Sequence, residues 1–123
     1  FNPKSEMTRI VGAAFRKNNP KEVLDFHGTN VGYTFDAIMI AADAYKRARS
    51  TDPKALAEAI RQTNIPVVNR MSLGGPIRFN PKGQVEGNLS AAIQNLKGKP
   101  TVTLPAEYAE AKVVFPSPGY KRG

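Results

Sequence analysis

The first part of the chain has apolar residues at the spacing of an amphipathic helix. They recur at i, i+3, i+4, i+7 and i+8: Met7, Ile10, Val11, Ala14 and Phe15. This spacing places them on one face of a helix. Asn2-Pro3 or Ser5 can cap its start, and Asn18-Asn19-Pro20 ends it, because proline disfavours a helical residue before it. Residues 20–27 are then expected to form a connector.

A longer apolar stripe predicts the main helix of the chain. Its members share one face: Val31, Phe35, Ile38, Ala42 and Tyr45. Thr29 or Asn30 is expected to cap the start of this helix. Its last turn carries cations, which suit the negative end of the helix dipole. These cations are Lys46, Arg47 and Arg49.

A third helix is predicted directly after the second, running to about Gln62. Asp52 is a suitable N-cap, and Pro53 is favoured at the first helical position. Its apolar face consists of Leu56, Ala57 and Ile60. We therefore expect two helices joined by a short connection.

Beyond Asn64 the helical spacing gives way to turns and short alternating runs. In chain order we expect a strand at 77–79, a turn at 80–83, a strand over 88–94, a turn at 97–100, a strand at 101–104, a short helix within 105–112, an extended piece at 113–115 and a Pro- and Gly-rich tail at 116–119. The turn at 80–83 is the clearest of these, because Asn80, Pro81 and Gly83 occupy positions that each prefers in a type I turn.

The order of elements, helices first and short strands after, places the chain in the α/β class. A sheet of two or three short strands has little framework of its own, because two-stranded pieces are marginal when alone. Beside three helices it leaves apolar faces poorly covered. We therefore expect the chain to complete a larger α/β body or to pack against a second copy.

Composition removes several classes of function. The chain has 123 residues, no cysteine and a single histidine, which excludes disulfides, thiolate metal sites and a cysteine nucleophile. The carboxylates lack the spacing of metal ligands, and no cofactor is expected. No apolar run approaches the about 20 residues that a membrane span requires.

No arrangement of residues predicts an enzyme. Nucleophilic catalysis needs a nucleophile beside a base, and the one histidine, His27, lies in the expected connector. Residues 28–32 resemble a phosphate loop only loosely, since they lack its lysine. Asp36 and Asp43 stand a full heptad apart, on what is expected to be the solvated side of the main helix.

The charge leaves one alternative function open. The sequence has 18 Lys+Arg against 10 Asp+Glu, a formal net charge of +8, and a basic balance is a first sign of phosphate binding. The cations are spread along the chain and acids interrupt most stretches, as on a solvated surface. The densest groups are Lys46-Arg47 with Arg49, Lys97 with Lys99, and Lys121-Arg122. The alternative hypothesis is therefore a free-standing basic module that binds nucleic acid or an acidic surface.

The start of the main helix, His27-Gly28-Thr29-Asn30, is the one local feature that suggests ligand binding. Free N–H groups and the positive dipole end at a helix N-terminus attract a carboxylate. Asn30 offers both a donor and an acceptor, and Tyr33 adds an aromatic wall with a hydroxyl. A plain N-cap beside a core tyrosine also explains these residues, and the sequence pattern alone favours that interpretation.

Longer blocks of sequence carry a family resemblance over essentially the whole chain. In order they are GYTFDA at 32–37, STDPKAL at 50–56, GGPIRFNPKGQ at 74–84 and AAIQNLKGK at 91–99. In this order and spacing the chain resembles the C-terminal third of a branched-chain amino-acid-type substrate-binding protein of an ABC transporter. That family, which includes leucine/isoleucine/valine-binding proteins, has the type I periplasmic-binding-protein fold.

The resemblance implies a non-enzymatic receptor with two α/β lobes joined by hinge strands. Residues 1–88 would complete one lobe, and residues 89–123 would supply hinge-proximal strands and the C-terminal tail. The sequence begins at Phe1 without a signal peptide, so we expect part of a mature exported protein, in the periplasm or attached to the cell surface. Its partners would be the N-terminal portion of the same receptor and a permease in the membrane, with no nucleic acid.

The resemblance also implies a small-molecule ligand, an amino acid or a related small carboxylate, held between the lobes. In the family the loop before the long helix faces this cleft, and that loop corresponds here to Gly28–Tyr33. Asn30 and Tyr33, with Thr29 as a third, are therefore the expected ligand-binding residues. No metal, cofactor or catalytic residue is implied.

Overall fold

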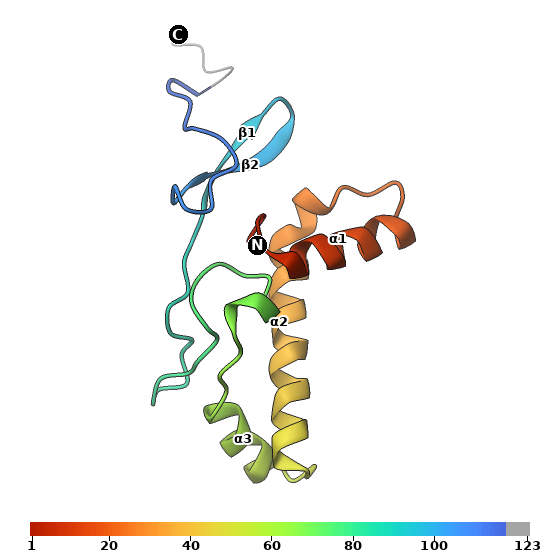
Figure 1. Cartoon of the computed structure of the whole chain (residues 1–123), viewed down its shortest axis with the longest axis vertical. Helices are drawn as coiled ribbons and strands as arrows, with labels where there is room; N and C mark the ends of the chain where they lie inside the picture. The colour runs from red at the N-terminus through yellow and green to blue at the C-terminus, as the bar shows by residue number, and fades with distance from the viewer. Residues whose placement is uncertain (118–123) are drawn as a thin grey trace.

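The computed structural model describes residues 1–117, without the side chains of Asp25 and Phe26. This part of the chain mixes helix and strand and is broadly α/β, as the sequence predicts (Figure 1). In chain order the elements are α1 (Glu6–Asn18), α2 (Leu24–Ala48), α3 (Pro53–Arg61), a short 3-10 helix (Val67–Asn69), β1 (Ala92–Leu96) and β2 (Lys99–Leu104). The long helix α2 contacts α1, α3 and β2, and α3 lies beside its C-terminal end.

Helices α1 and α3 begin and end where their capping residues predict. Ser5 is the N-cap residue of α1, although its hydroxyl makes no capping bond. Asp52 caps α3, and its carboxylate accepts a hydrogen bond from the Ala55 N–H at 2.9 Å. Pro53 occupies the first turn, as expected. Both predicted helices are confirmed.

Helix α2 starts earlier than the sequence predicts. It begins at Leu24, so Thr29 and Asn30 lie inside the helix and do not cap it. The predicted connector at 20–27 is correspondingly shorter. The reason is tertiary contact, because Leu24 is buried against α1, where a Cβ added to Gly12 would lie 3.2 Å from the Leu24 side chain. Such contacts override the local preference for a polar cap.

The face of α2 that packs within the described chain is not the predicted apolar stripe. Its buried residues recur every four positions from Leu24 to Asp36, through Gly28 and Gly32, and Ala44 follows after the half-buried Ile40. The predicted stripe lies on another side of the helix, where Ile38 is 61% exposed and Tyr45 is 52% exposed. Helix α2 therefore makes its contacts mainly with Leu24, small residues and one carboxylate. Val31 and Phe35 of the apolar stripe are half-buried, and its second half, Ile38, Ala42 and Tyr45, is exposed.

The segment after α3 has fewer regular strands than predicted. Residues 77–79 form isolated bridges in place of a strand: Ile65 with Ile77, and Phe79 with Val85. The turn at 80–83 is confirmed, because the Gly83 N–H donates to the Asn80 carbonyl at 2.8 Å.

Strands β1 and β2 form an antiparallel hairpin. Its turn consists of Lys97 and Gly98, both with positive φ, at 53° and 77°. The hairpin confirms the returning strand, but β1 starts at Ala92 rather than residue 88. The helix expected within 105–112 is wrong, because this segment forms turns.

The segment around Val114 lies beside β1 but does not form a strand. The Gln94 side chain accepts from the Val114 N–H at 2.9 Å and donates to the Val114 carbonyl at 2.8 Å. The Gln94 side-chain amide therefore makes the two hydrogen bonds to Val114 that the backbone of a neighbouring strand would make. Of the predicted tail at 116–119, residues 118 and 119 lie outside the described part of the chain.

The buried apolar residues come from α2, α3, β2 and the segment around the 3-10 helix. They are Leu24, Ala44, Ala59, Ile65, Met71, Leu73, Ile77 and Val102. Met71, in the loop after the 3-10 helix, is fully buried. The core therefore fixes the loop at 70–73 against α2, and this loop holds the polar residues described next.

Candidate functional site

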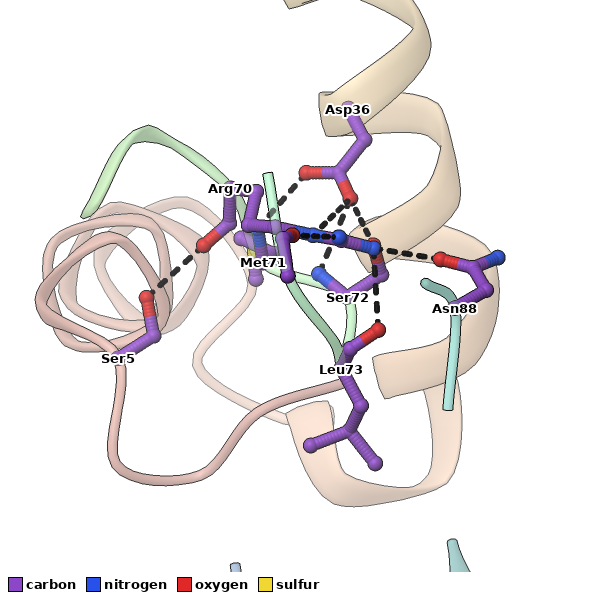
Figure 2. Close-up of polar contacts among 8 residues, drawn as sticks. Ser5, Asp36, Arg70, Met71, Ser72, Leu73 and Asn88 are labelled. Carbon is purple, nitrogen blue, oxygen red and sulfur yellow. Dashed lines mark hydrogen bonds and ion pairs between the residues drawn. The ribbon is translucent and has the colours of Figure 1, made fainter. Parts of the chain in front are cut away.

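Asp36 of α2 anchors the loop at 70–73 (Figure 2). One carboxylate oxygen accepts a hydrogen bond from the Met71 N–H at 2.7 Å, and the other accepts from the Ser72 N–H at 3.0 Å. The Ser72 hydroxyl also donates to Asp36. Asp36 is only 5% exposed. The prediction that this aspartate is solvated is therefore wrong.

Arg70 is the buried counterpart of Asp36. It is 1% exposed, and its Nε lies 3.8 Å from Asp36 Oδ2. Its Nη2 donates to the Leu73 carbonyl at 3.0 Å and to Asn88 Oδ1 at 2.7 Å, and Nη1 donates to the Gly75 carbonyl. Burial lowers the pKa of Arg70, and the negative charge of Asp36 acts in the opposite direction.

These hydrogen bonds join four segments that are distant in sequence. Asp36 holds the loop to α2, and Asn88 ties the segment before β1 to the same guanidinium. The Ser5 hydroxyl, at the start of α1, donates to the Arg70 carbonyl at 2.9 Å. We call Asp36, Arg70, Ser72 and Asn88 the polar cluster. It fixes the relative positions of the walls of a neighbouring cavity.

The cavity lies between the first half of α2 and the hairpin and has a volume of about 250 Å³. One face of α2 contributes Thr29, Gly32 and Tyr33. The other walls are formed by Phe1, the loop after the 3-10 helix, residues 89–91, both strands and Glu110. Small-molecule sites in proteins are concave and mostly apolar, with a few polar groups. This cavity is concave, but polar and apolar groups share its surface about equally.

The structure brings two of the three predicted ligand-binding residues into this cavity. Thr29 and Tyr33, one helical turn apart on α2, line it. Asn30 is exposed and lies outside the lining. The spacing i, i+4 places Thr29 and Tyr33 on one face of the helix, whereas i+1 turns Asn30 away.

The predicted anion site at a helix N-terminus is wrong. It required free N–H groups at residues 28–30, but these residues lie beyond the first turn of α2. Only the first four N–H groups of a helix lack a partner within the helix. The backbone there cannot hold a carboxylate.

Sequence reasoning missed the polar cluster and Glu110, which also lines the cavity. A weak signal existed for Asp36, which lies four residues after Gly32 and eight after Gly28, on the face with the smallest side chains. Nothing local marks Arg70 or Asn88, because their roles depend on contacts across the fold.

The remaining chemistry is sparse in the described part of the chain. His27 is exposed, and its Nε2 lies 3.2 Å from the Glu22 carboxylate. Among the side chains that the structure describes, which exclude that of Asp25, no group of three or more His, Asp or Glu could hold a metal ion. Among residues 1–117, no helix has the length and apolar character needed to cross a membrane.

No family model matches the sequence, and no curated protein matches it. The interpretation of function therefore depends on the residues and the geometry described above.

Proposed function

We propose that the chain is the C-terminal portion of the solute-binding component of an ABC importer. The receptor captures a small molecule, an amino acid or a related small carboxylate, between two lobes and delivers it to a membrane permease. The observation that carries the proposal is the cavity beside α2, because it contains Thr29 and Tyr33, two of the residues that the sequence resemblance assigns to the ligand.

The open stripe of α2 supports the part of the proposal that concerns the fold. Exposed apolar and small residues recur at i, i+3, i+4 and i+7: Ile38, Ala41, Ala42 and Tyr45. An amphipathic helix of a globular protein turns such a stripe towards the core. The two-stranded hairpin does not cover it. A larger type I periplasmic-binding-protein lobe, completed by residues 1–88, would supply the missing sheet.

The same proposal gives residues 89–123 a place near the hinge between the lobes. The hairpin forms one wall of the cavity, so ligand binding and hinge position would be coupled there. Closure follows if the ligand binds the closed form more tightly than the open one. The permease would then recognise the closed form, in the periplasm or at the cell surface.

The proposal is tested on the full-length protein as purified. Native mass spectrometry reports whether a small molecule accompanies it, and calorimetry measures its affinity after removal. We expect Tyr33→Ala and Thr29→Ala to weaken binding about tenfold, the effect of losing one hydrogen bond and its contact area. Thr34→Ala, also exposed on α2 but outside the cavity, is the control.

Asn30→Ala locates the ligand more closely. A loss equal to that of Tyr33→Ala would place the ligand over the outer side of α2 rather than in the cavity. A full-length protein that neither carries nor binds a small molecule would overturn the proposal. If the protein binds duplex DNA, and its affinity falls steeply as the salt concentration rises, the alternative of a basic nucleic-acid-binding module is favoured instead.

A further inference from the structure

The geometry points to a conformational device in one wall of the cavity. Residues 87–91, which we call the strap, pair with the loop at 70–75 and reach the cavity lining at Leu89. We infer that the strap lifts from this loop without unfolding of the protein, and that the hydrogen bond between Arg70 and Asn88 is the catch that holds it down. The inference goes beyond the proposed function, because it concerns how this wall opens, whichever small molecule the cavity takes.

The backbone contacts between the strap and the loop are weak. One hydrogen bond runs from the Gly75 N–H to the Gly87 carbonyl at 3.1 Å, and another from the Leu89 N–H to the Leu73 carbonyl at 3.3 Å. The second is longer than a typical N–H···O bond. Residues 81–90 are all exposed. Exposed hydrogen bonds with little buried apolar surface behind them open first in a native protein.

The strongest contact of the strap is the side-chain bond to Arg70. Arg70 Nη2 donates to Asn88 Oδ1 at 2.7 Å, and Figure 2 shows this amide facing the guanidinium. A hydrogen bond from a charged donor is about twice as strong as one between neutral groups. Arg70 is buried and paired with Asp36, so it does not follow the strap outwards. The strap therefore lifts only when Asn88 leaves Arg70.

The guanidinium keeps other partners when Asn88 leaves. Nη2 of Arg70 also donates to the Leu73 carbonyl at 3.0 Å and to the Ser72 hydroxyl. Water solvates the exposed Asn88 amide once it is released. A buried donor that retains a partner avoids the large penalty of an unsatisfied group. The catch can therefore open while Arg70 stays in place.

Lifting the strap would open the cavity from this side. Leu89, Ser90 and Ala91 line the cavity from the strap. On the facing loop, Leu73 also lines the cavity but is only 4% exposed. Movement of the strap would uncover Leu73 and give a small molecule a way in.

Amide hydrogen exchange of the full-length protein in low urea, with no ligand added, tests the movement. We expect the Leu89 N–H to exchange at a rate that urea does not change, because a local opening exposes little surface. The N–H of Ala44, a buried residue of α2, should exchange more slowly and accelerate with urea. Asn88→Ala should speed exchange at Leu89 about tenfold to a hundredfold, the effect of losing a bond to a charged group. Asn88→Asp, which keeps an acceptor for Arg70, should restore the slow exchange.

Alkylation of a cysteine placed in the cavity wall tests access. The chain has no cysteine of its own, so Leu73→Cys supplies a thiol, and peptide mass spectrometry locates the iodoacetamide adduct. We expect alkylation without urea to become about tenfold faster or more when Asn88→Ala is added. A melting curve checks that Leu73→Cys folds, and the exchange measurement requires no substitution in the loop.

Glu86→Ala is the matched control, because Glu86 is exposed directly before the strap, and exchange at Leu89 should not change in this variant. The inference is wrong if Leu89 exchanges only through urea-dependent unfolding, as Ala44 does, or if Asn88→Ala alters exchange at Leu89 no more than Glu86→Ala. Alkylation of Leu73→Cys that Asn88→Ala does not accelerate would also overturn it. These outcomes do not depend on the receptor function, which a bound small molecule tests separately.

Discussion

A buried ion pair is stable only when its remaining donors and acceptors are also satisfied, because burial removes the water that would solvate both charges. Asp36 and Arg70 meet this condition. The carboxylate accepts from two backbone N–H groups and a hydroxyl, and the guanidinium donates to three carbonyl oxygens of the backbone or of Asn88. Each residue therefore depends on the other.

Asp36→Ala is expected to lower the free energy of unfolding by about 3–5 kcal/mol, because it leaves the Arg70 charge buried without its partner. Urea unfolding of the full-length protein measures this loss. The control is Asp43→Ala, on the same helix, whose carboxylate pairs with Arg47 at the surface with an Nε–Oδ2 distance of 2.9 Å. An exposed i, i+4 pair contributes about 0.3–0.5 kcal/mol. Equal losses in the two variants would contradict the role of Asp36.

At the scale of elements, the sequence predicts helices where local signals decide their limits. Asp52 and Pro53 define the start of α3, and Ser5 stands at the N-cap of α1, although its hydroxyl bonds to the Arg70 carbonyl and not to the helix. The start of α2 could not be predicted in this way, because it depends on the packing of Leu24 against α1. The predicted orientation of α2 was wrong for a related reason. The most apolar face of this helix is not the face that packs in the described chain.

The strands show the same limit. The turn at Lys97-Gly98 is visible in the sequence, but the length of β1 depends on a contact across the fold. The Leu89 N–H donates to the Leu73 carbonyl at 3.3 Å, so the chain before β1 pairs with the loop at 70–75 instead of continuing the hairpin. Alternation of apolar residues does not reveal such pairing.

This crossing of segments requires a glycine at position 74. Gly74 has a φ of +123°, and a Cβ there would lie 2.1 Å from the Gly87 carbonyl oxygen. We expect Gly74→Ala to lower the free energy of unfolding by about 2 kcal/mol or more, from backbone strain and from the clash. Urea unfolding measures the loss, and slower amide exchange at Leu89 in the parent protein than in the variant would locate it.

Gly75→Ala is the neighbouring control, since a Cβ there meets nothing within 4 Å. A surface substitution of this kind changes stability by about 0.5 kcal/mol or less. A Gly74→Ala variant as stable as Gly75→Ala would show that the two segments do not approach as closely as described.

At the scale of the whole molecule, the candidate site combines what the sequence could and could not reveal. The family resemblance predicted Asn30, Tyr33 and Thr29 as ligand-binding residues, and of these Thr29 and Tyr33 line the cavity. Asn88 and Glu110 were not predicted, since Asn88 meets Arg70 18 residues away and Glu110 meets Val102 eight residues away through a turn predicted as helix. Long-range contacts create the cavity, and a single sequence contains no direct record of them.

The open stripe of α2 gives the sharpest test of whether a larger body surrounds this chain. If a sheet covers Ile38 in the full-length protein, Ile38→Asn buries a polar amide there and removes apolar contact. The free energy of unfolding should then fall by about 2–4 kcal/mol. Lys46→Asn, also exposed on α2, controls for helix propensity and should cost about 0.5 kcal/mol or less. Thermal or urea unfolding measures both.

Protein concentration distinguishes the two ways of covering the stripe. If the cover belongs to the same chain, the melting temperature of the parent protein and the loss in Ile38→Asn are independent of concentration. If a second copy supplies it, the parent melting temperature rises with concentration and that of Ile38→Asn rises less, because association stabilises by mass action. If Ile38→Asn is no less stable than Lys46→Asn at any concentration, the apolar stripe is exposed to water in the full-length protein. The hypothesis of a larger α/β body would then have to be abandoned.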